Sequence, residues 1–180
     1  MSEPSERAVL RTGADINITR ATPSDLRVVT EFYSDLDDDA TYFRFFGIRR
    51  QIPEAELRRV VSDDIGHVTL LAHMNGLLVG IGEYIVGNEP TEAEVAFAVA
   101  DGHHREGIAT LLLERLAVIA HDHGLLQLSA MVLAGNADMQ LVFRTVGLPI
   151  ENTFDDGIVH TFLDVTSLAP LRDAIAARAG

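Results

Sequence analysis

The sequence predicts a single α/β domain in which strands alternate with amphipathic helices. Its 180 residues are enough for one domain with a sizeable core. Residues 93–113 join an alternating apolar run to a long amphipathic helix through a short polar turn, the pattern of a strand that feeds a helix. Residues 67–73 and 77–86 are β-compatible runs separated by Met74-Asn75-Gly76, and Asn-Gly strongly favours a tight hairpin.

The part of the chain before this hairpin is predicted to contain one strand and two helices. Residues 1–14 are polar and aperiodic, and we expect them to be a disordered lead-in. Residues 15–20 alternate as a strand. Thr22 and Pro23 are typical of the N-cap and first position of a helix, and a further short helix is expected at 53–61.

The second half is predicted to continue with strands and helices in turn: a strand at 126–133, a helix at 137–146, a strand at 158–164 and a terminal helix within 166–180. His123-Gly124 favours the end of the long helix, and Ser167 is expected to cap the terminal helix. That last helix can pack on its own domain or on a second copy, as in a homodimer.

Composition and charge narrow the function classes. The net charge of −13 argues against a nucleic-acid surface, which needs a basic patch, and favours cationic partners such as amines. The absence of cysteine excludes disulfides and a thiol nucleophile. No apolar run approaches the roughly 20 residues of a membrane span, and the N-terminus lacks the regions of a signal peptide. We therefore expect a cytoplasmic protein that binds neither nucleic acid nor membrane.

The turn within residues 93–113 is suited to an anion. A strand that feeds a helix through glycine-containing backbone leaves N–H groups without intrahelical partners at the positive end of the helix dipole, which suits a pyrophosphate. Gly107 and the small Ala109 let a ligand approach the backbone closely. The same residues also suit an ordinary strand-to-helix turn, because single-glycine patterns are weak signals.

The run His104-Arg105-Glu106-Gly107-Ile108-Ala109 resembles the Gln/Arg-x-x-Gly-x-Gly/Ala loop of the GNAT acetyltransferases, which binds the pyrophosphate of acetyl-CoA. Thr110 continues the match, whereas His104 stands where the family usually has Gln or Arg. The expected order of elements over residues 15–165 is also that of a GNAT domain. The resemblance implies a mixed, mostly antiparallel central sheet flanked by helices, here followed by a C-terminal tail helix over 166–180.

The same resemblance implies acetyl-CoA as the co-substrate. The backbone at Phe97 and Val99 is expected to pair with the pantetheine arm, as an extra strand would, because the two central strands separate there in GNAT folds. The Val99 N–H can then polarise the thioester carbonyl. Asn136 matches an asparagine that contacts pantetheine, although an N-cap is an equally good role. The cofactor-binding set is Phe97, Val99, His104, Arg105, Glu106, Gly107, Ile108, Ala109, Thr110, Asn136 and Phe143.

Acetyl transfer to an amine requires a neutral nitrogen, and one glutamate is placed to produce it. A lysine with a pKa of about 10.4 favours its protonated form at pH 7 by about 4.6 kcal/mol, and a nearby carboxylate can take that proton. Glu94 is the candidate because it lies on the strand that leads into the loop, on the face lined by Ala96 and Ala98. The proposed base of the family also matches Glu94. Glu92 is the reserve candidate, and a solvent-facing strand glutamate is the structural alternative.

Two further segments bear on the acceptor. Asp35-Leu36-Asp37-Asp38-Asp39 is either a solvated helix end or a negative rim that attracts a cation. Tyr42-Phe43-Arg44-Phe45-Phe46 resembles a segment in the second helix of bacterial protein-lysine acetyltransferase GNAT domains, where it flanks the acceptor site. The likeness is therefore closest to those catalytic domains, although the chain is too short to carry their regulatory domains as well.

Phe143 departs from many GNAT enzymes, in which a tyrosine at this spacing protonates the departing thiolate. Phenylalanine cannot donate a proton, but the protein-acetylating branch of the family shares it. A metal site is not expected, since His121 and His123 are two residues apart on a helix and do not share a face. His121 is instead expected on a polar helix face with Thr110 and Glu114.

The sequence thus predicts an acetyl-CoA-dependent N-acetyltransferase that acts on a primary amine, with the lysine side chain of a protein as the first choice of acceptor. Two alternatives remain open at this point. One is transfer to a small-molecule amine, and the other is a non-catalytic acyl-CoA-binding regulatory module.

Overall fold

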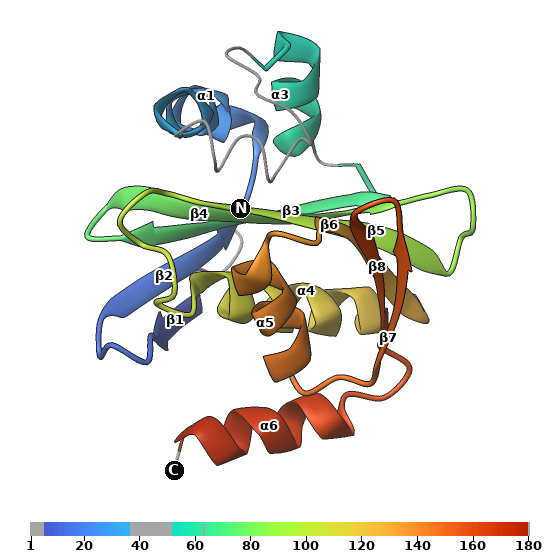
Figure 1. Ribbon diagram of the computed structural model, residues 1–180. Coiled ribbons are helices and arrows are strands. Elements are labelled where there is room, and N and C mark those ends of the chain that lie inside the picture. The colour runs from blue at the N-terminus through green and yellow to red at the C-terminus, as the bar shows by residue number, and fades with distance from the viewer. Residues whose placement is uncertain (1–5, 37–51, 63, 180) are drawn as a thin grey trace.

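The computed structural model describes residues 6–36, 52–62 and 64–179 and shows one mixed sheet with helices on both faces (Figure 1). The strands follow the spatial order β1-β2-β3-β4-β5-β6-β8-β7. All neighbouring strands are antiparallel except β5 and β6, which are parallel. The predicted fold class, with its mixed and mostly antiparallel sheet, is confirmed.

Apart from β1 and β7, for which no residue range was predicted, the elements lie close to the predicted boundaries. The strands are β1 Glu6–Val9, β2 Asp15–Arg20, β3 His67–Met74, β4 Leu77–Val86, β5 Glu92–Val99, β6 Gln127–Leu133, β7 Ile150–Asp155 and β8 Ile158–Asp164. The helices are η1 Pro23–Asp25, α1 Leu26–Asp35, α3 Glu54–Val60, α4 Ile108–Asp122, α5 Ala137–Thr145 and α6 Ala169–Ala179.

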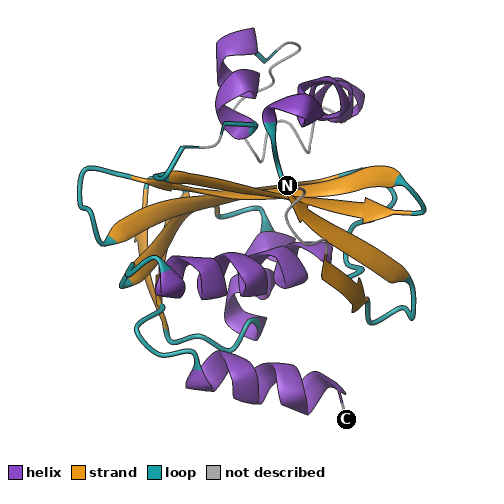
Figure 2. Ribbon diagram, turned by 180° about the vertical axis from the view of Figure 1, so that it is seen from behind, coloured by secondary structure: helices purple, strands orange, loops and turns teal. Residues whose placement is uncertain are grey.

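The sheet separates two layers of helices. Helices α1 and α3 cover one face, and α4, α5 and α6 lie on the other side, as the two opposite views show (Figures 1 and 2). Strand β5 contributes to both cores: Val95 and Phe97 belong to the larger cluster with α4, whereas Ala98 belongs to the smaller cluster with α1 and α3. The alternation read from the sequence therefore corresponds to two buried faces.

The structure of residues 6–14 differs from the prediction. We expected residues 1–14 to be a disordered lead-in, but β1 pairs antiparallel with β2, from Glu6 opposite Ile18 to Val9 opposite Asp15. Leu10 follows the strand and is buried in the main core. The segment looked irregular because its order depends on hydrogen bonds supplied by β2 and on a core formed by distant helices, neither of which is visible locally.

Helix α4 is attached to the sheet at its C-terminal end. The Tyr84 hydroxyl lies 2.7 Å from His123 Nδ1, at the C-cap of the helix, and Tyr84 is fully buried on β4. Burial raises the pKa of Tyr84 to about 12, although the positive charge of Arg20 opposes the shift. This contact helps to fix the direction in which the N-terminal end of α4 points.

The terminal helix packs on its own domain. Leu168 and Leu171 are buried in the main core. Gly147 has φ +94°, and a Cβ at that position would lie 2.3 Å from the Cβ of Ala174. Only glycine combines this backbone conformation with so close an approach, so the end of α5 and the helix α6 are matched to each other.

Two predicted features lie outside the described residues, namely Asp37–Asp39 of the acidic cluster and the aromatic segment Tyr42–Phe46. In the part of the chain that the structure does describe, no helix combines the length and the apolar character needed to cross a membrane.

Candidate active site

The two central strands separate in the middle of the sheet. Strands β5 and β6 pair only from Glu92 opposite Gln127 to Glu94 opposite Ser129, although β5 continues to Val99 and β6 to Leu133. Beyond Glu94 and Ser129 the strands are no longer paired with each other. Residues from both of these unpaired segments line a cavity of about 1090 Å³.

The backbone of β5 faces this opening with free hydrogen-bonding groups at alternate residues. The Ala100 N–H donates to the Val79 carbonyl across the β4 side at 2.9 Å. Because backbone groups alternate along a strand, the N–H and C=O groups of Phe97 and Val99 point toward the β6 side. The Val99 carbonyl accepts a hydrogen bond from His104 Nε2 at 3.2 Å. The two residues predicted to pair with an extended ligand thus have the required orientation.

The polar turn ends at an open helix N-terminus. Gly107 is the N-cap of α4 with φ +95°, in the left-handed region that glycine adopts without strain. Within the described residues, no side chain caps this end of the helix. The first-turn N–H groups therefore lack side-chain partners and sit at the positive end of the helix dipole, an arrangement that binds anions.

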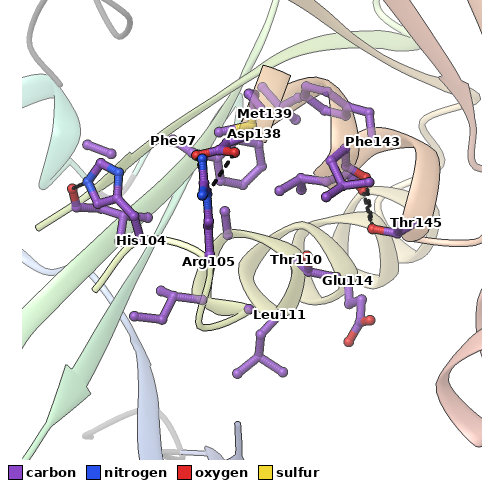
Figure 3. A pocket seen from close by; sticks show the side chains of 18 of the residues that line it. Phe97, His104, Arg105, Thr110, Leu111, Glu114, Asp138, Met139, Phe143 and Thr145 are labelled. Atoms are coloured by element: carbon purple, nitrogen blue, oxygen red, sulfur yellow. Dashed lines mark hydrogen bonds and ion pairs between the residues drawn. The ribbon is translucent and has the colours of Figure 1, made fainter. Parts of the chain in front are cut away.

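An ion pair links this turn to α5. Arg105 Nε donates to both carboxylate oxygens of Asp138 at 3.1 Å, and Figure 3 shows the two side chains facing each other. Arg105 itself has φ +64°, a conformation that costs a non-glycine residue of order 1 kcal/mol. Both side chains are largely exposed, so the pair adds little stability but holds the loop beside the start of α5.

Asn136 and Phe143 form the α5 side of the cavity. Asn136 caps α5, and its Oδ1 accepts a hydrogen bond from the Met139 N–H at 3.1 Å, so the N-cap role considered for it is confirmed. Phe143 is buried and lies edge-to-face with Phe97, with ring centroids 6.2 Å apart. This aromatic pair joins α5 to β5 where the strands separate.

Glu94 stands where β5 and β6 part. It is the last β5 residue paired with β6, and its exposed side chain lines the cavity. The side chain is on the face opposite Val95, which is buried against α4. On β6, Ser129 and Met131 share that face, because Leu128 and Ala130 are buried in the opposite one. The reserve candidate Glu92 does not line the cavity.

The structure brings nearly all of the predicted site residues together. Lining the cavity are Glu94, Phe97, Val99, His104, Arg105, Gly107, Ile108, Ala109, Thr110, Asn136 and Phe143. The exception is Glu106, which is not part of the lining and whose carboxylate lies 3.0 Å from His103 Nδ1. The Glu106 side chain therefore contacts its own loop and does not face the cavity.

Other lining residues were not anticipated. They include Arg7–Arg11, Glu114, Arg115, Met131 and Met139. We expected Glu114 on a polar helix face, but it is buried and lies 3.2 Å from Arg115, because α4 is enclosed by β1 and α5 as well as by the sheet. His121 was expected on the same polar face, but its Nδ1 lies 2.8 Å from the Val165 carbonyl oxygen. Helical periodicity alone does not reveal these neighbours.

Among residues 6–36, 52–62 and 64–179 there is no group of three or more His, Asp or Glu side chains arranged to hold a metal ion.

Comparisons with known proteins by sequence and by structure find the same family. The model of the acetyltransferase (GNAT) family matches residues 29–148. The GNAT domain of S. lividans PAT has a similar structure, with a TM-score of 0.81 and 30% sequence identity, over 89% of this chain and 96% of that chain.

Two more distant structures share the fold. The acetyltransferase yncA from Salmonella typhimurium, solved with acetyl-CoA, has a TM-score of 0.67 at 18% identity and covers 84% of this chain and 95% of that chain. A cAMP-binding acyltransferase from Mycobacterium smegmatis has a TM-score of 0.64 at 22% identity over 98% of this chain, which spans 56% of that protein.

Proposed function

This chain belongs to the GNAT family of N-acetyltransferases, and from that premise we propose that it transfers an acetyl group from acetyl-CoA to a lysine side chain of a protein. The observation that carries the proposal is the continuity of one cavity, which is lined by the open N-terminus of α4, the free backbone of β5 and the carboxylate of Glu94. A cofactor held at the helix end and extended along β5 has its thioester near the point where the strands part.

In the proposed reaction, Glu94 accepts a proton from the ammonium group of the acceptor, directly or through a water molecule. The neutral nitrogen attacks the thioester carbonyl and the C–N bond forms. As the C–S bond breaks, coenzyme A leaves as a thiolate, and the nitrogen releases its second proton to solvent water, from which the thiolate takes a proton. The Val99 N–H, which points toward the opening, stabilises the negative charge that develops on the carbonyl oxygen. The remaining cofactor residues hold the pyrophosphate and pantetheine.

Phe143 supplies no proton to the leaving thiolate. The free energy associated with releasing a thiolate is nevertheless smaller than that needed to deprotonate the lysine. A thiol with a pKa of about 8.5 favours its protonated form at pH 7 by only about 2 kcal/mol, whereas the lysine ammonium is favoured by about 4.6 kcal/mol. Activation of the nucleophile is thus the larger requirement. Because the cavity is open, water can protonate the thiolate after it leaves.

A protein lysine is the proposed acceptor for two reasons. S. lividans PAT, a protein acetyltransferase, shares 30% identity over most of this chain. The net charge of −13 favours encounter with a cationic partner. We call the region around Glu94 and Met131 the acceptor end of the cavity. Its side chains lie on exposed or half-buried strand positions, which a lysine side chain can reach.

The test is acetyl transfer to a graded set of amines. Lysine-containing peptides, intact basic proteins and small amines such as spermidine are incubated with the protein and acetyl-CoA, and the products are identified by mass spectrometry. We expect acetylated lysines in peptides or proteins and slower transfer to small amines. A preference for the small amines would contradict the proposed acceptor. If acetyl-CoA remains unconsumed with every acceptor, the proposed activity is contradicted.

A further inference from the structure

The cavity extends beyond the residues expected to hold acetyl-CoA. Besides the walls formed by β5 and α5, it has a wall that comprises Arg7, Leu10 and Arg11 of the N-terminal hairpin with Leu111 and Arg115 of α4. We call these five residues the β1 wall. Gly107 and Ile108, at the open N-terminus of α4, line the same cavity.

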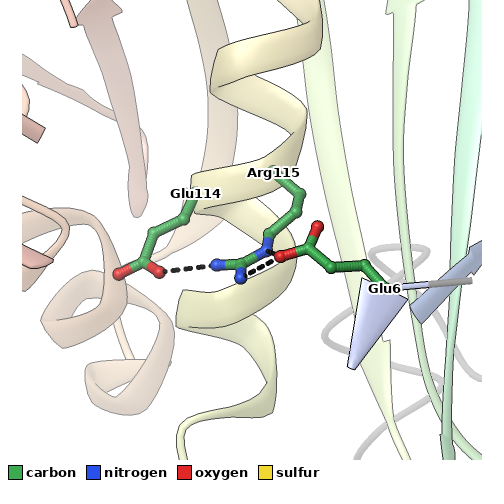
Figure 4. A network of polar contacts seen from close by, with 3 residues as sticks. All are labelled: Glu6, Glu114 and Arg115. Carbon is green, nitrogen blue, oxygen red and sulfur yellow. Dashed lines mark hydrogen bonds and ion pairs between the residues drawn. The ribbon is translucent and has the colours of Figure 1, made fainter. Parts of the chain in front are cut away.

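An ion-pair network holds the N-terminal hairpin beside α4. Arg115 Nε donates to a carboxylate oxygen of Glu6 at 3.1 Å, and its Nη1 lies 3.2 Å from Glu114 (Figure 4). Glu114 is buried and Arg115 is mostly buried, so this contact is less screened than a surface pair. Strand β1 is joined to the middle of the helix through the Arg115–Glu6 pair, in which the Glu6 side chain is about half exposed.

The arginines that line the cavity differ in whether they have an ion-pair partner. Arg105 is paired with Asp138, and Arg115 is paired with Glu6 and Glu114. Arg7 and Arg11 make no ion pair or side-chain hydrogen bond with any residue in the described part of the chain, and both are exposed. Both residues line the cavity, and neither would lose an existing partner on binding an anionic ligand.

Coenzyme A carries a second anionic group besides its pyrophosphate. Its pyrophosphate is flanked by the pantetheine arm on one side and by the 3′-phosphorylated adenosine on the other. If pantetheine follows β5 away from the helix N-terminus, the 3′-phosphate must leave the loop in another direction. The α5 wall carries Asp138 and no cationic side chain, whereas the β1 wall carries the two unpaired arginines.

We propose that Arg7 and Arg11 bind the 3′-phosphate of coenzyme A, so that the N-terminal hairpin forms one wall of the cofactor site. This inference rests on the proposed use of acetyl-CoA. Arginine suits the role because its planar fork matches phosphate oxygens and stays charged at any physiological pH. In a chain with a net charge of −13, a local cationic wall also offsets the repulsion of a polyanionic cofactor.

The experiment compares coenzyme A with 3′-dephospho-coenzyme A by calorimetry. The test variant carries Arg7→Gln and Arg11→Gln, and the control variant carries Arg59→Gln and Arg172→Gln. Both control residues are exposed and lie outside the cavity. Their substitution changes the net charge by the same amount as the substitutions in the test variant. Thermal unfolding of all three proteins verifies that they are folded to the same extent.

We expect the test variant to bind coenzyme A about tenfold more weakly, which corresponds to the loss of about 1.4 kcal/mol, and to bind the dephospho form as the wild type does. The control variant should bind both ligands like the wild type. An equal loss for both ligands, or no loss for either, would overturn the inference.

The same measurements separate this inference from the proposed function. If the wild type binds coenzyme A and acetylates lysine peptides but does not distinguish it from the dephospho form, only the 3′-phosphate site is refuted. If the wild type binds neither ligand, the proposed function fails, and the inference fails with it.

Discussion

The two ends of the cavity are built in different ways. Most of the cofactor end comes from one continuous stretch, residues 97–110, with Asn136 and Phe143 added from α5, and it offers mainly backbone groups: the edge of β5 and the open N-terminus of α4. The acceptor end consists of side chains from neighbouring strands, with Glu94 on β5 and Met131 on β6. The first can be read from a local motif, whereas the second exists only when the sheet is assembled.

This difference has a functional consequence. Backbone groups at the cofactor end do not change when side chains are substituted, so the recognition of a constant ligand is protected. Side chains at the acceptor end can vary without disturbing the strand that carries them, and this freedom allows related domains to act on different amines. Substitutions at the two ends should therefore separate catalysis from cofactor binding.

The largest expected effect is at the acceptor end. Glu94→Gln should lower kcat for a lysine peptide at pH 7 by about 10²- to 10³-fold, because it removes the proposed proton acceptor, and should leave the affinity for coenzyme A unchanged. The rate of the variant should recover as the pH approaches the amine pKa, where free amine becomes abundant. Steady-state kinetics between pH 7 and pH 10 and calorimetry measure both quantities.

Glu92→Gln is the matched control for this variant, since Glu92 lies two residues away on the same face of β5 but does not line the cavity. Its kcat should stay within about twofold of the wild type. If the two variants have equal rates, or if Glu92→Gln is the slower, Glu94 is not the base.

A smaller effect is expected at the cofactor end. Gly107→Ala should weaken coenzyme A binding by about tenfold, because it places a Cβ beside the backbone donors and forces a left-handed conformation on a residue that disfavours it. Calorimetry and thermal unfolding measure affinity and stability separately. The kcat at saturating acetyl-CoA should change much less than in Glu94→Gln.

Gly102→Ala provides the comparison for Gly107→Ala. Gly102 also has positive φ and free space around its Cβ position, but it does not line the cavity. Both variants should lose a similar stability, of order 1 kcal/mol, while only the change at Gly107 weakens coenzyme A binding. Equal affinities in the two variants would remove Gly107 from the cofactor site.

The anchor of α4 gives a pH-dependent effect. Tyr84→Phe removes the hydrogen bond to His123 and should cost about 1 kcal/mol at pH 8. The pKa of Tyr84 is about 12 in the folded protein and about 10 when unfolded. Between these values the folded state binds more protons, so the wild type loses stability as pH rises through that window.

The phenylalanine variant lacks this titration. The difference in unfolding free energy between wild type and Tyr84→Phe should therefore narrow above pH 10 and change sign before pH 12, as followed by chemical denaturation, because a two-unit difference in pKa corresponds to about 2.7 kcal/mol. A difference that stays constant across this range would show that the hydroxyl does not titrate differently in the folded state.

The smallest expected effect is at the end of β8. Hydrogen bonds from the hydroxyl and N–H of Thr166 lower the pKa of Asp164 below its usual 3.8. The carboxylate thus stabilises the folded state above that value, and the contribution disappears as pH falls through the lowered pKa. Asp164→Asn should reduce the Tm by about 1 to 2 °C at pH 7 and by less at pH 3. An undiminished difference at pH 3 would contradict this assignment.

Much of the architecture was predictable because it depends on local patterns. The Asn75-Gly76 turn, the alternation along β5 and the glycine-ended turn before α4 each specify a conformation within a few residues. The face of β5 on which Glu94 lies was predictable for the same reason, because side chains alternate along a strand. The β1 strand and the buried Glu114 were not predictable, since both depend on elements far away in the chain.

The sequence by itself determined most of the order of the elements, the glycine-ended turn before α4 and the face on which Glu94 lies, because these follow from backbone preference and from the period of apolar residues. Only the tertiary structure decided that β5 and β6 part just beyond Glu94 and that the N-terminal hairpin lies against α4 with Arg7 and Arg11 in the cavity wall. Those features arise from strand pairing and from ion pairs between residues about a hundred positions apart, and such long-range contacts leave no periodic signature in the sequence.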